Sequence, residues 1–143
     1  MKKYTILVVI LLLCGCSMKS NTQKAEIILK NGKPTTFKGE QMMCFERGEE
    51  ITIILKNTGS KPLTLPNTAP WIIYRIYNTT PVYQPIAAQV LVKLNPNETI
   101  KWTWDQRDYN GNTVDVGLYK VVIRTFELKL YKKFVIAERC HIE

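Results

Sequence analysis

Apolar and polar residues alternate along most of the chain after residue 23, with the two-residue period of β-strands. The alternating segments are short, and turn residues separate them about every 8–12 positions, as in β-sandwiches. Apolar residues nowhere keep the 3.6-residue period of a helix over a long stretch, so we expect almost no helix. The pattern predicts an all-β fold, an antiparallel β-sandwich of about seven or eight strands, at residues 24–30, 49–57, 63–66, 71–78, 88–94, 99–105, 117–126 and 129–138.

The alternation also assigns one face of each strand to the core. Trp102 and Trp104 stand two positions apart and therefore share a face. Large aromatic side chains at this spacing are more often buried in a core than offered to a ligand, so we predict that both pack inward. In two other strands, the residues predicted to face inward are Ile51, Ile53, Leu55, Tyr119, Val121, Ile123 and Thr125.

The N-terminus has the features of an export signal. Lys2 and Lys3 precede an unbroken apolar run at residues 6–13, and the sequence LCGC follows and ends at Cys16. A helix that spans a bilayer needs about 20 residues, so this run suits the apolar part of a signal peptide instead. The small residue before Cys16 makes the segment similar to a prokaryotic lipoprotein signal. An ordinary secretory peptide and a buried helix with incidental cysteines are the alternatives.

The lipoprotein interpretation divides the chain into three parts. Residues 1–15 form the signal peptide, residues 16–23 form a polar tether that begins with the lipidated Cys16, and residues 24–143 form one domain. A mature chain of about 128 residues can bury a core of its own. We therefore expect an extracytoplasmic protein that the lipidated cysteine anchors to the cell membrane.

The charge of the chain argues against nucleic acid as a partner. The chain has 20 Lys and Arg against 12 Asp and Glu, a net charge of +8, and loss of Lys2 and Lys3 leaves +6. The basic residues are scattered, with no run longer than two, whereas nucleic-acid binding favours a clustered basic face with interleaved aromatic residues. Attraction to anionic lipid headgroups or to the cell wall, or a simple effect on solubility, is the expected consequence.

Two cysteines, Cys44 and Cys140, remain in the mature chain. In an oxidising compartment two such thiols are usually paired, so we predict a disulfide between them. On the chain-entropy model a bridge of this span contributes about 4–5 kcal/mol. Two unpaired thiols and an intermolecular bridge through Cys140 are the alternatives.

The stretch from Lys101 to Arg124 raises the question of a metal site. Asp108, Asn110 and Asn112 stand at alternate positions, as the first three ligands of an EF-hand loop do. Gly111 lies between the second and third of them, however, and position twelve is Tyr119 instead of a glutamate. Asn-Gly also favours the positive φ of a hairpin turn. We predict turn chemistry here, with a calcium site as the weaker alternative and no other metal or cofactor.

Catalytic residues are not indicated. A hydrolytic nucleophile needs a base beside it, usually histidine, and the one histidine is His141, next to Cys140. Adjacent residues of a strand point to opposite faces, so this pair is not a dyad. Asp105 and Asp108 provide paired carboxylates, but no insertion that would form a cleft accompanies them. We predict that the protein is not an enzyme.

The segment from residue 95 to residue 124 resembles the intracellular proteinase inhibitor (BsuPI) family, whose domain is immunoglobulin-like. A similar hairpin occurs in the immunoglobulin-like domain of flagellar hook-assembly scaffold proteins. The resemblance implies an immunoglobulin-like sandwich in which the Asp and Gly residues shape the turn and the tyrosine packs beneath it. The residues that carry it are Pro96, Glu98, Trp102, Trp104, Asp105, Gln106, Asp108, Asn110, Gly111, Val114, Gly117 and Tyr119.

The resemblance implies a protein-binding module, with a peptidase as the partner to be inhibited. The segment YNTTPVYQP is aromatic and rich in proline, so we expect a stiff loop that contacts the partner or, as the alternative, an ordinary connection between strands. A structural envelope or adhesion component without inhibitory activity, and a calcium- or glycan-binding module, are the other hypotheses. The oligomeric state is left open. The candidate contact residues are Tyr77, Pro81, Tyr83 and Pro85.

Overall fold

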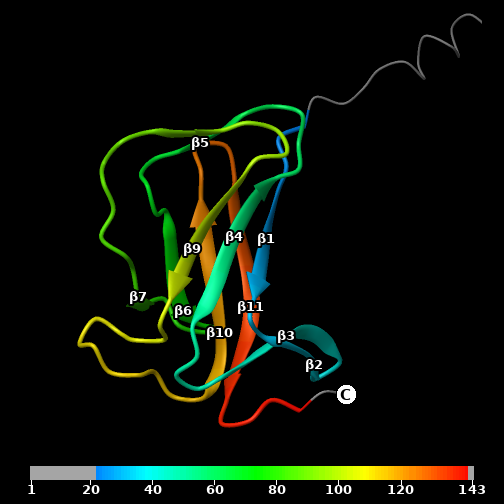
Figure 1. The fold of residues 1–143 in the computed structure, drawn as a ribbon, viewed down its shortest axis with the longest axis vertical. Coiled ribbons are helices and arrows are strands. Elements are labelled where there is room, and N and C mark those ends of the chain that lie inside the picture. Colours follow the sequence, from blue (N-terminus) through cyan, green and yellow to red (C-terminus); the bar gives the residue numbers. More distant parts are fainter. Residues whose placement is uncertain (1–21, 142–143) are drawn as a thin grey trace, which may run out of the picture.

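The computed structural model describes residues 22–141, which form eleven β-strands and, within that range, no helix (Figure 1). No helix in this range is long and apolar enough to cross a membrane. The predicted signal peptide and the lipidation site Cys16 lie outside the described residues. The strands are β1 (Ala25–Lys30), β2 (Lys33–Phe37), β3 (Glu40–Glu46), β4 (Ile51–Asn57), β5 (Leu63–Leu65), β6 (Trp71–Arg75), β7 (Pro81–Tyr83), β8 (Val92–Leu94), β9 (Thr99–Trp104), β10 (Gly117–Arg124) and β11 (Lys129–Ala137).

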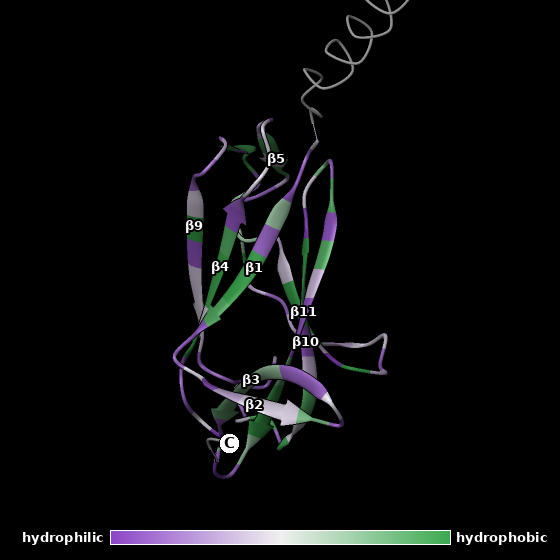
Figure 2. Cartoon of the chain, turned by 90° about the vertical axis from the view of Figure 1, so that its right-hand side faces the viewer, coloured by the Kyte–Doolittle hydropathy of each residue, from purple (hydrophilic) through white to green (hydrophobic). Residues whose placement is uncertain are grey.

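Two main sheets form the predicted sandwich. The small sheet has the order β1-β4-β9, the large sheet has the order β2-β3-β11-β10-β6-β7, and β5 pairs with β8 at one end. Figure 2, seen from the side, shows β9, β4 and β1 as one layer and β10 and β11 as the other. The order β1-β4-β9 in the small sheet and the order β11-β10-β6 in the large sheet are those of strands A, B and E and strands G, F and C of immunoglobulin-like domains. The fold class predicted from the sequence is therefore confirmed.

The strand count and one strand direction differ from the prediction. The sequence pattern predicted no strand at the positions of β2, β3 and β7. The C-terminal half of β3 pairs with β11 in parallel, from Met43 opposite Phe134 to Glu46 opposite Ala137, so the large sheet is mixed and not purely antiparallel. The turn between β2 and β3 uses Lys38 and Gly39 at positive φ, and the resulting hairpin crosses the end of the sandwich (Figure 2).

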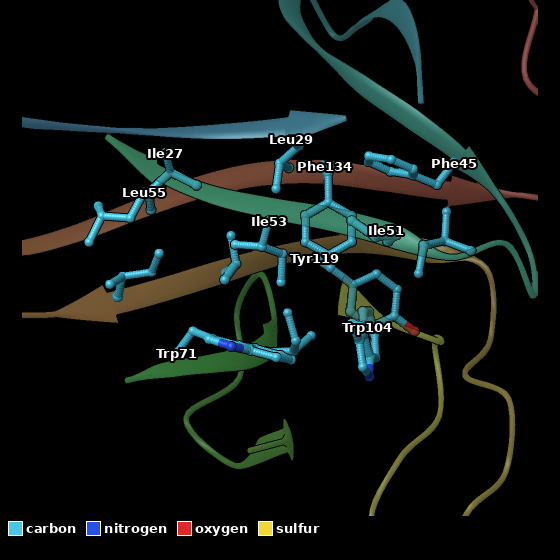
Figure 3. Packing of buried hydrophobic residues seen from close by; sticks show 14 of the residues in the cluster. Ile27, Leu29, Phe45, Ile51, Ile53, Leu55, Trp71, Trp104, Tyr119 and Phe134 are labelled. Atoms are coloured by element: carbon cyan, nitrogen blue, oxygen red, sulfur yellow. The ribbon is translucent and has the colours of Figure 1, made fainter. Parts of the chain in front are cut away.

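The core lies between the two sheets and follows the predicted faces (Figure 3). Trp104 is buried, whereas Trp102 lies at the rim, where its indole N–H donates to the Thr68 carbonyl at 2.8 Å. Thr125 is an exception, because β10 ends at Arg124 and the Thr125 hydroxyl accepts the Leu128 N–H in the following turn. The inward residues whose burial is confirmed are Ile51, Ile53, Leu55, Tyr119, Val121 and Ile123.

The two ends of the sandwich carry different features. Lys24 lies where the described chain enters the domain, and its carbonyl accepts the N–H groups of Thr58 and Gly59 beyond β4. The turn between β10 and β11 lies at this same end (Figure 1), and the Phe126 N–H in this turn donates to the Thr64 carbonyl of β5. The loop between β9 and β10 lies toward the other end, together with β7 (Figure 1).

Candidate functional site

The tip of the loop between β9 and β10 is organised around the Asp108 carboxylate. Oδ1 of Asp108 accepts the N–H groups of Asn110 at 2.9 Å and Asn112 at 3.0 Å. The Gly111 N–H donates to the Asp108 carbonyl, and Gly111 has φ +78°, a conformation that glycine adopts without strain. These contacts are those of the turn chemistry predicted from the sequence.

The same contacts bear on the alternative of a calcium site. Within residues 22–141, no group of three or more His, Cys, Asp or Glu side chains is placed to hold a metal ion. Of the three candidate ligands, Asp108 supplies the one carboxylate, and its Oδ1 is already occupied by backbone donors. Calcium binding by Asp108, Asn110 and Asn112 stays a prediction that a titration can test.

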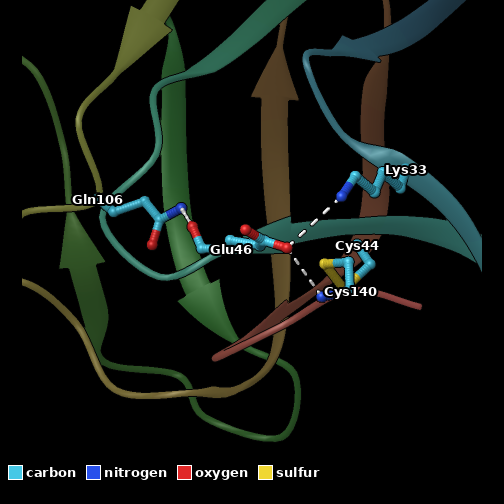
Figure 4. Close-up of a disulfide and its surroundings, with 5 residues drawn as sticks. All are labelled: Lys33, Cys44, Glu46, Gln106 and Cys140. Carbon is cyan, nitrogen blue, oxygen red and sulfur yellow. Dashed lines mark hydrogen bonds and ion pairs between the residues drawn. A yellow bond between two sulfur atoms is a disulfide. The ribbon is translucent and has the colours of Figure 1, made fainter.

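Gln106 locks this loop to the turn between β3 and β4. Its side chain is fully buried, and its amide N–H donates to the Glu46 carbonyl at 2.9 Å (Figure 4). Its side-chain carbonyl oxygen accepts the Gly48 N–H at 2.9 Å. The residue has φ 62°, a left-handed conformation that is uncommon outside glycine. The buried bonds hold it there, so the glutamine of the WxWDQ sequence has a structural role.

Tyr119 fastens the other end of the loop. The ring is fully buried near the start of β10, and its hydroxyl donates to the Asp115 carbonyl at 2.6 Å. This is the tyrosine corner of immunoglobulin-like sandwiches, in which a tyrosine of strand F bonds backbone a few residues upstream. Burial raises the pKa of Tyr119 above its ordinary value, and the cation of Arg75, 5.0 Å from the ring centroid, opposes that rise.

The predicted partner loop divides into parts with different surroundings. Pro81 and Tyr83 belong to the edge strand β7, so this part is a strand and not a free loop. The Tyr83 ring packs against Trp71, Trp104 and Tyr109, with centroids 5.9–6.4 Å apart, which fixes β7 on the core. Pro85 follows, half-buried, in the connection to β8.

The connection from β6 to β8 exposes large apolar side chains. We call residues 77–91 the exposed segment. Tyr77 is 93% exposed and Ile86 fully exposed, and Val90 and Leu91 are more than half exposed. The strand predicted at residues 88–94 is wrong for its first half, because only Val92–Leu94 pair with a neighbour. These four side chains lie within 15 consecutive residues, and the sequence pattern assigned Val90 and Leu91 to a strand instead.

The predicted disulfide joins Cys44 of β3 to Cys140 after β11, with the two Cα atoms 5.8 Å apart (Figure 4). Glu46 supports the same junction, because its Oε2 accepts the Cys140 N–H at 3.1 Å and lies 3.6 Å from Lys33 Nζ. The backbone bond first, and then the lysine, hold the pKa of Glu46 below its ordinary value. Because Cys140 is bridged, its neighbour His141 has no thiol to activate.

The basic residues are less scattered than the sequence suggested. Lys120 and Arg124 of β10 and Lys129 and Lys133 of β11 line hollows on the outer face of the large sheet. The sequence does indicate that each pair shares a face of its strand, since the two residues of each pair are four positions apart. The sequence does not indicate the register of the hairpin, which places the two pairs side by side.

Comparisons with known proteins do not identify a family. No family model matches the chain, and no curated protein matches it. The chain is similar in structure to the Pseudomonas fluorescens alkylpurine DNA glycosylase AlkC, with 15% identity and a TM-score of 0.46 over 80% of this chain and 30% of that one. It is also similar to a β-glucosidase from Listeria innocua, with 12% identity and a TM-score of 0.37 over 83% of this chain and 17% of that one. The chain spans less than a third of either enzyme, and likenesses this weak carry no argument about activity.

Proposed function

We propose that this protein is a lipid-anchored, extracytoplasmic module that binds a protein partner through the exposed segment, residues 77–91. The exposure of Tyr77, Ile86, Val90 and Leu91 within one short segment carries the proposal. Single exposed apolar residues are ordinary, whereas an exposed apolar patch that a partner covers is typical of a protein-binding surface, which is the role we propose for these side chains. Burying one such side chain gains about 1.5–3 kcal/mol, so a partner that covers several of them binds favourably.

The contacts that hold the exposed segment on the rest of the domain support the same proposal. Tyr83 packs on the core in the middle of the segment, and β8, which follows the segment, pairs with β5. In between, the Thr68 N–H donates to the Ala88 carbonyl, and the Ala88 N–H donates to the Thr68 hydroxyl. A segment held in this way loses little conformational entropy when a partner binds.

The location outside the cytoplasm rests on two observations. The disulfide between Cys44 and Cys140 is of a kind that persists in oxidising compartments. The N-terminal sequence supplies the apolar run and Cys16 of a lipoprotein signal. An eight-residue tether at residues 16–23 spans at most about 28 Å, which keeps the domain close to the membrane surface.

Inhibition of a peptidase is the more specific form of the proposal, and it rests on the resemblance of residues 95–124 to the BsuPI family. A structural envelope component without inhibitory activity is the second candidate, favoured by the same exposed segment. A calcium- or glycan-binding role is the third, and the alternating Asp108, Asn110 and Asn112 motivate its calcium form.

A pull-down with matched variants tests the binding surface. The full chain, an Ile86→Ser/Leu91→Ser variant and a Val116→Ser/Phe126→Ser control are each used to capture proteins from envelope extract. Both variants remove two exposed apolar side chains, but only the first changes the exposed segment. We expect a partner that the wild type and the control retain and the Ile86→Ser/Leu91→Ser variant loses. If both variants recover the partner equally well, residues 77–91 are not the binding surface.

The nature of the recovered partner separates the functional alternatives. A peptidase whose activity falls when the wild-type protein is added supports inhibition, and recovery of envelope scaffold proteins alone contradicts it. Calcium added to the pure protein tests the third candidate, since absence of a shift in melting temperature at excess calcium would exclude a calcium site. A Cys16→Ala variant that stays in the membrane fraction would contradict the lipid anchor.

A further inference from the structure

The outer face of the large sheet carries a groove with an unusual lining. Two adjoining hollows of about 770 and 630 Å³ share Asn78, Lys120 and Tyr131. Strands β10 and β11 form the floor, and the turn between β6 and β7 forms one wall. None of the residues that line the groove belongs to the loop between β9 and β10. The groove shares Tyr77, Asn78 and Thr79 with the exposed segment, but Ile86 and Leu91, whose replacement tests partner binding, do not line it.

The sheet register places like charges opposite one another in this groove. Lys120 of β10 pairs with Lys133 of β11, and Arg124 pairs with Lys129. Like charges directly opposite in antiparallel strands destabilise a sheet. The two pairs are four residues apart along β10, about 13 Å, with the Tyr131 ring between them.

Little negative charge balances these cations. Lys133 Nζ lies 3.2 Å from Glu40, the one carboxylate among the described residues that line the two hollows. Lys120 Nζ stands 5.7 Å from the centroid of the Tyr74 ring. Within residues 22–141, no carboxylate lies within ion-pair distance of Arg124 or Lys129. These facing cations therefore do not stabilise the folded sheet, and their arrangement is suited to an anionic ligand.

The tyrosines of the groove narrow the chemistry of that ligand. Tyr74, Tyr77 and Tyr131 line the same hollows as the cations, and Tyr131 is 63% exposed. An open ring face can pack against the C–H face of a sugar ring, while the hydroxyl and ammonium groups bond to sugar hydroxyls and carboxylates. A polyphosphate chain has no apolar face for these rings.

An acidic peptide is the other anionic ligand to consider. Strand β10 pairs with β6 on one side and with β11 on the other, so a peptide cannot add a strand beside β10. Strand β11 pairs with β3 only from Phe134 to Ala137, so residues 129–133 could still accept a strand, but this mode of binding would leave the exposed Tyr131 ring without a role. We propose that the groove binds an acidic polysaccharide, with Arg124, Lys129 and Lys120 facing its anionic groups and Tyr131 packing against a sugar ring.

The experiment uses the full chain in neutral detergent and measures binding by calorimetry at low salt. The probes are polygalacturonate and hyaluronate, with dextran as the neutral control, polyphosphate as the phosphate control and polyglutamate as the peptide control. The test variants are Arg124→Gln/Lys129→Gln and Tyr131→Ser. The matched control is Lys93→Gln/Lys101→Gln, which removes the same charge from exposed positions outside the groove, on β8 and β9.

We expect at least one acidic polysaccharide to bind, and dextran not to bind. Kd should rise at least tenfold for Arg124→Gln/Lys129→Gln, rise several-fold for Tyr131→Ser and stay within twofold for the control. The proposal is overturned if neither polysaccharide binds, or if polyphosphate or polyglutamate binds as tightly as the polysaccharides do. It is also overturned if Tyr131→Ser leaves Kd unchanged, or if Kd rises as much for Lys93→Gln/Lys101→Gln as for Arg124→Gln/Lys129→Gln. Melting curves establish that each variant is folded, and replacement of Arg124 and Lys129 relieves repulsion and leaves the core untouched.

Discussion

Removal of the disulfide should cost a large part of the stability of this domain. The bridge closes 96 residues of sequence between Cys44 and Cys140, which include the strands from β4 to β11. On the chain-entropy relation, a loop of that length corresponds to about 4.7 kcal/mol at 25 °C. Domains of this size have total unfolding free energies of about 5–15 kcal/mol, so the bridge corresponds to about 30% or more of the total.

The contacts around the bridge give no substitute for it. The parallel pairing of β3 with β11 spans four residue pairs. The bond from the Cys140 N–H to Glu46 depends on the C-terminal segment staying beside β3. We therefore expect the Cys44→Ala/Cys140→Ala variant to lose about 3–5 kcal/mol of unfolding free energy.

The assay is urea unfolding followed by circular dichroism, with and without reductant. Reductant should lower the midpoint of the wild type toward that of the variant and leave the variant unchanged, because the variant has no bridge to reduce. A loss below about 1 kcal/mol, or a variant that still responds to reductant, would refute the reasoning.

Three further predictions concern stability. Tyr119→Phe removes the bond to the loop and should cost about 1 kcal/mol in urea unfolding. Because burial raises the folded pKa of Tyr119 above 10.0, the wild type should lose stability as pH rises through that folded pKa, and the variant should lack this loss. Glu46→Gln should narrow the stability difference between pH 7 and pH 3. The pKa of Glu46 lies below 4.5 in the folded state, so its contribution is present above 4.5 and is lost as pH falls through the folded pKa. Lys129→Thr relieves the repulsion with Arg124 and should raise the unfolding free energy by about 0.2–1 kcal/mol in thermal or urea unfolding.

Each of these predictions has a contradicting outcome. A Tyr119→Phe variant as stable as the wild type would show that the hydroxyl does not hold the loop. If the Glu46→Gln variant shows the same stability difference between pH 7 and pH 3 as the wild type, other carboxylates cause the loss of stability in acid. A Lys129→Thr variant less stable than the wild type would mean that the lysine stem contributes packing that outweighs the repulsion.

Local alternation was sufficient for the centre of the fold. In strand β4 and in β10 one face is more apolar than the other, and the prediction for Ile53 and Val121 followed directly. Strands β2 and β3 lack a long alternating run, and their placement depends on pairing with β11 some 90 residues later. Such pairing leaves no local mark in a sequence, which is why β3 and its parallel direction were missed.

The candidate sites show the same limit. The turn contacts of Asp108 and Gly111 lie within a few residues of one another, so the sequence predicted them. The groove depends on the register that sets Lys120 opposite Lys133, and a one-residue shift would place these side chains on opposite faces. The exposed side chain of Ile86 was also missed, because apolar composition alone does not distinguish an exposed segment from a buried one.

Photo-cross-linking in intact cells tests the proposed partner binding most directly. A photoreactive phenylalanine analogue is placed at Ile86 in the exposed segment and, in a separate strain, at Phe126, which is also exposed and lies beyond the end of β10. The account predicts a defined protein adduct from position 86 and none from position 126. Adducts of equal yield from both positions, or none from position 86, would contradict it.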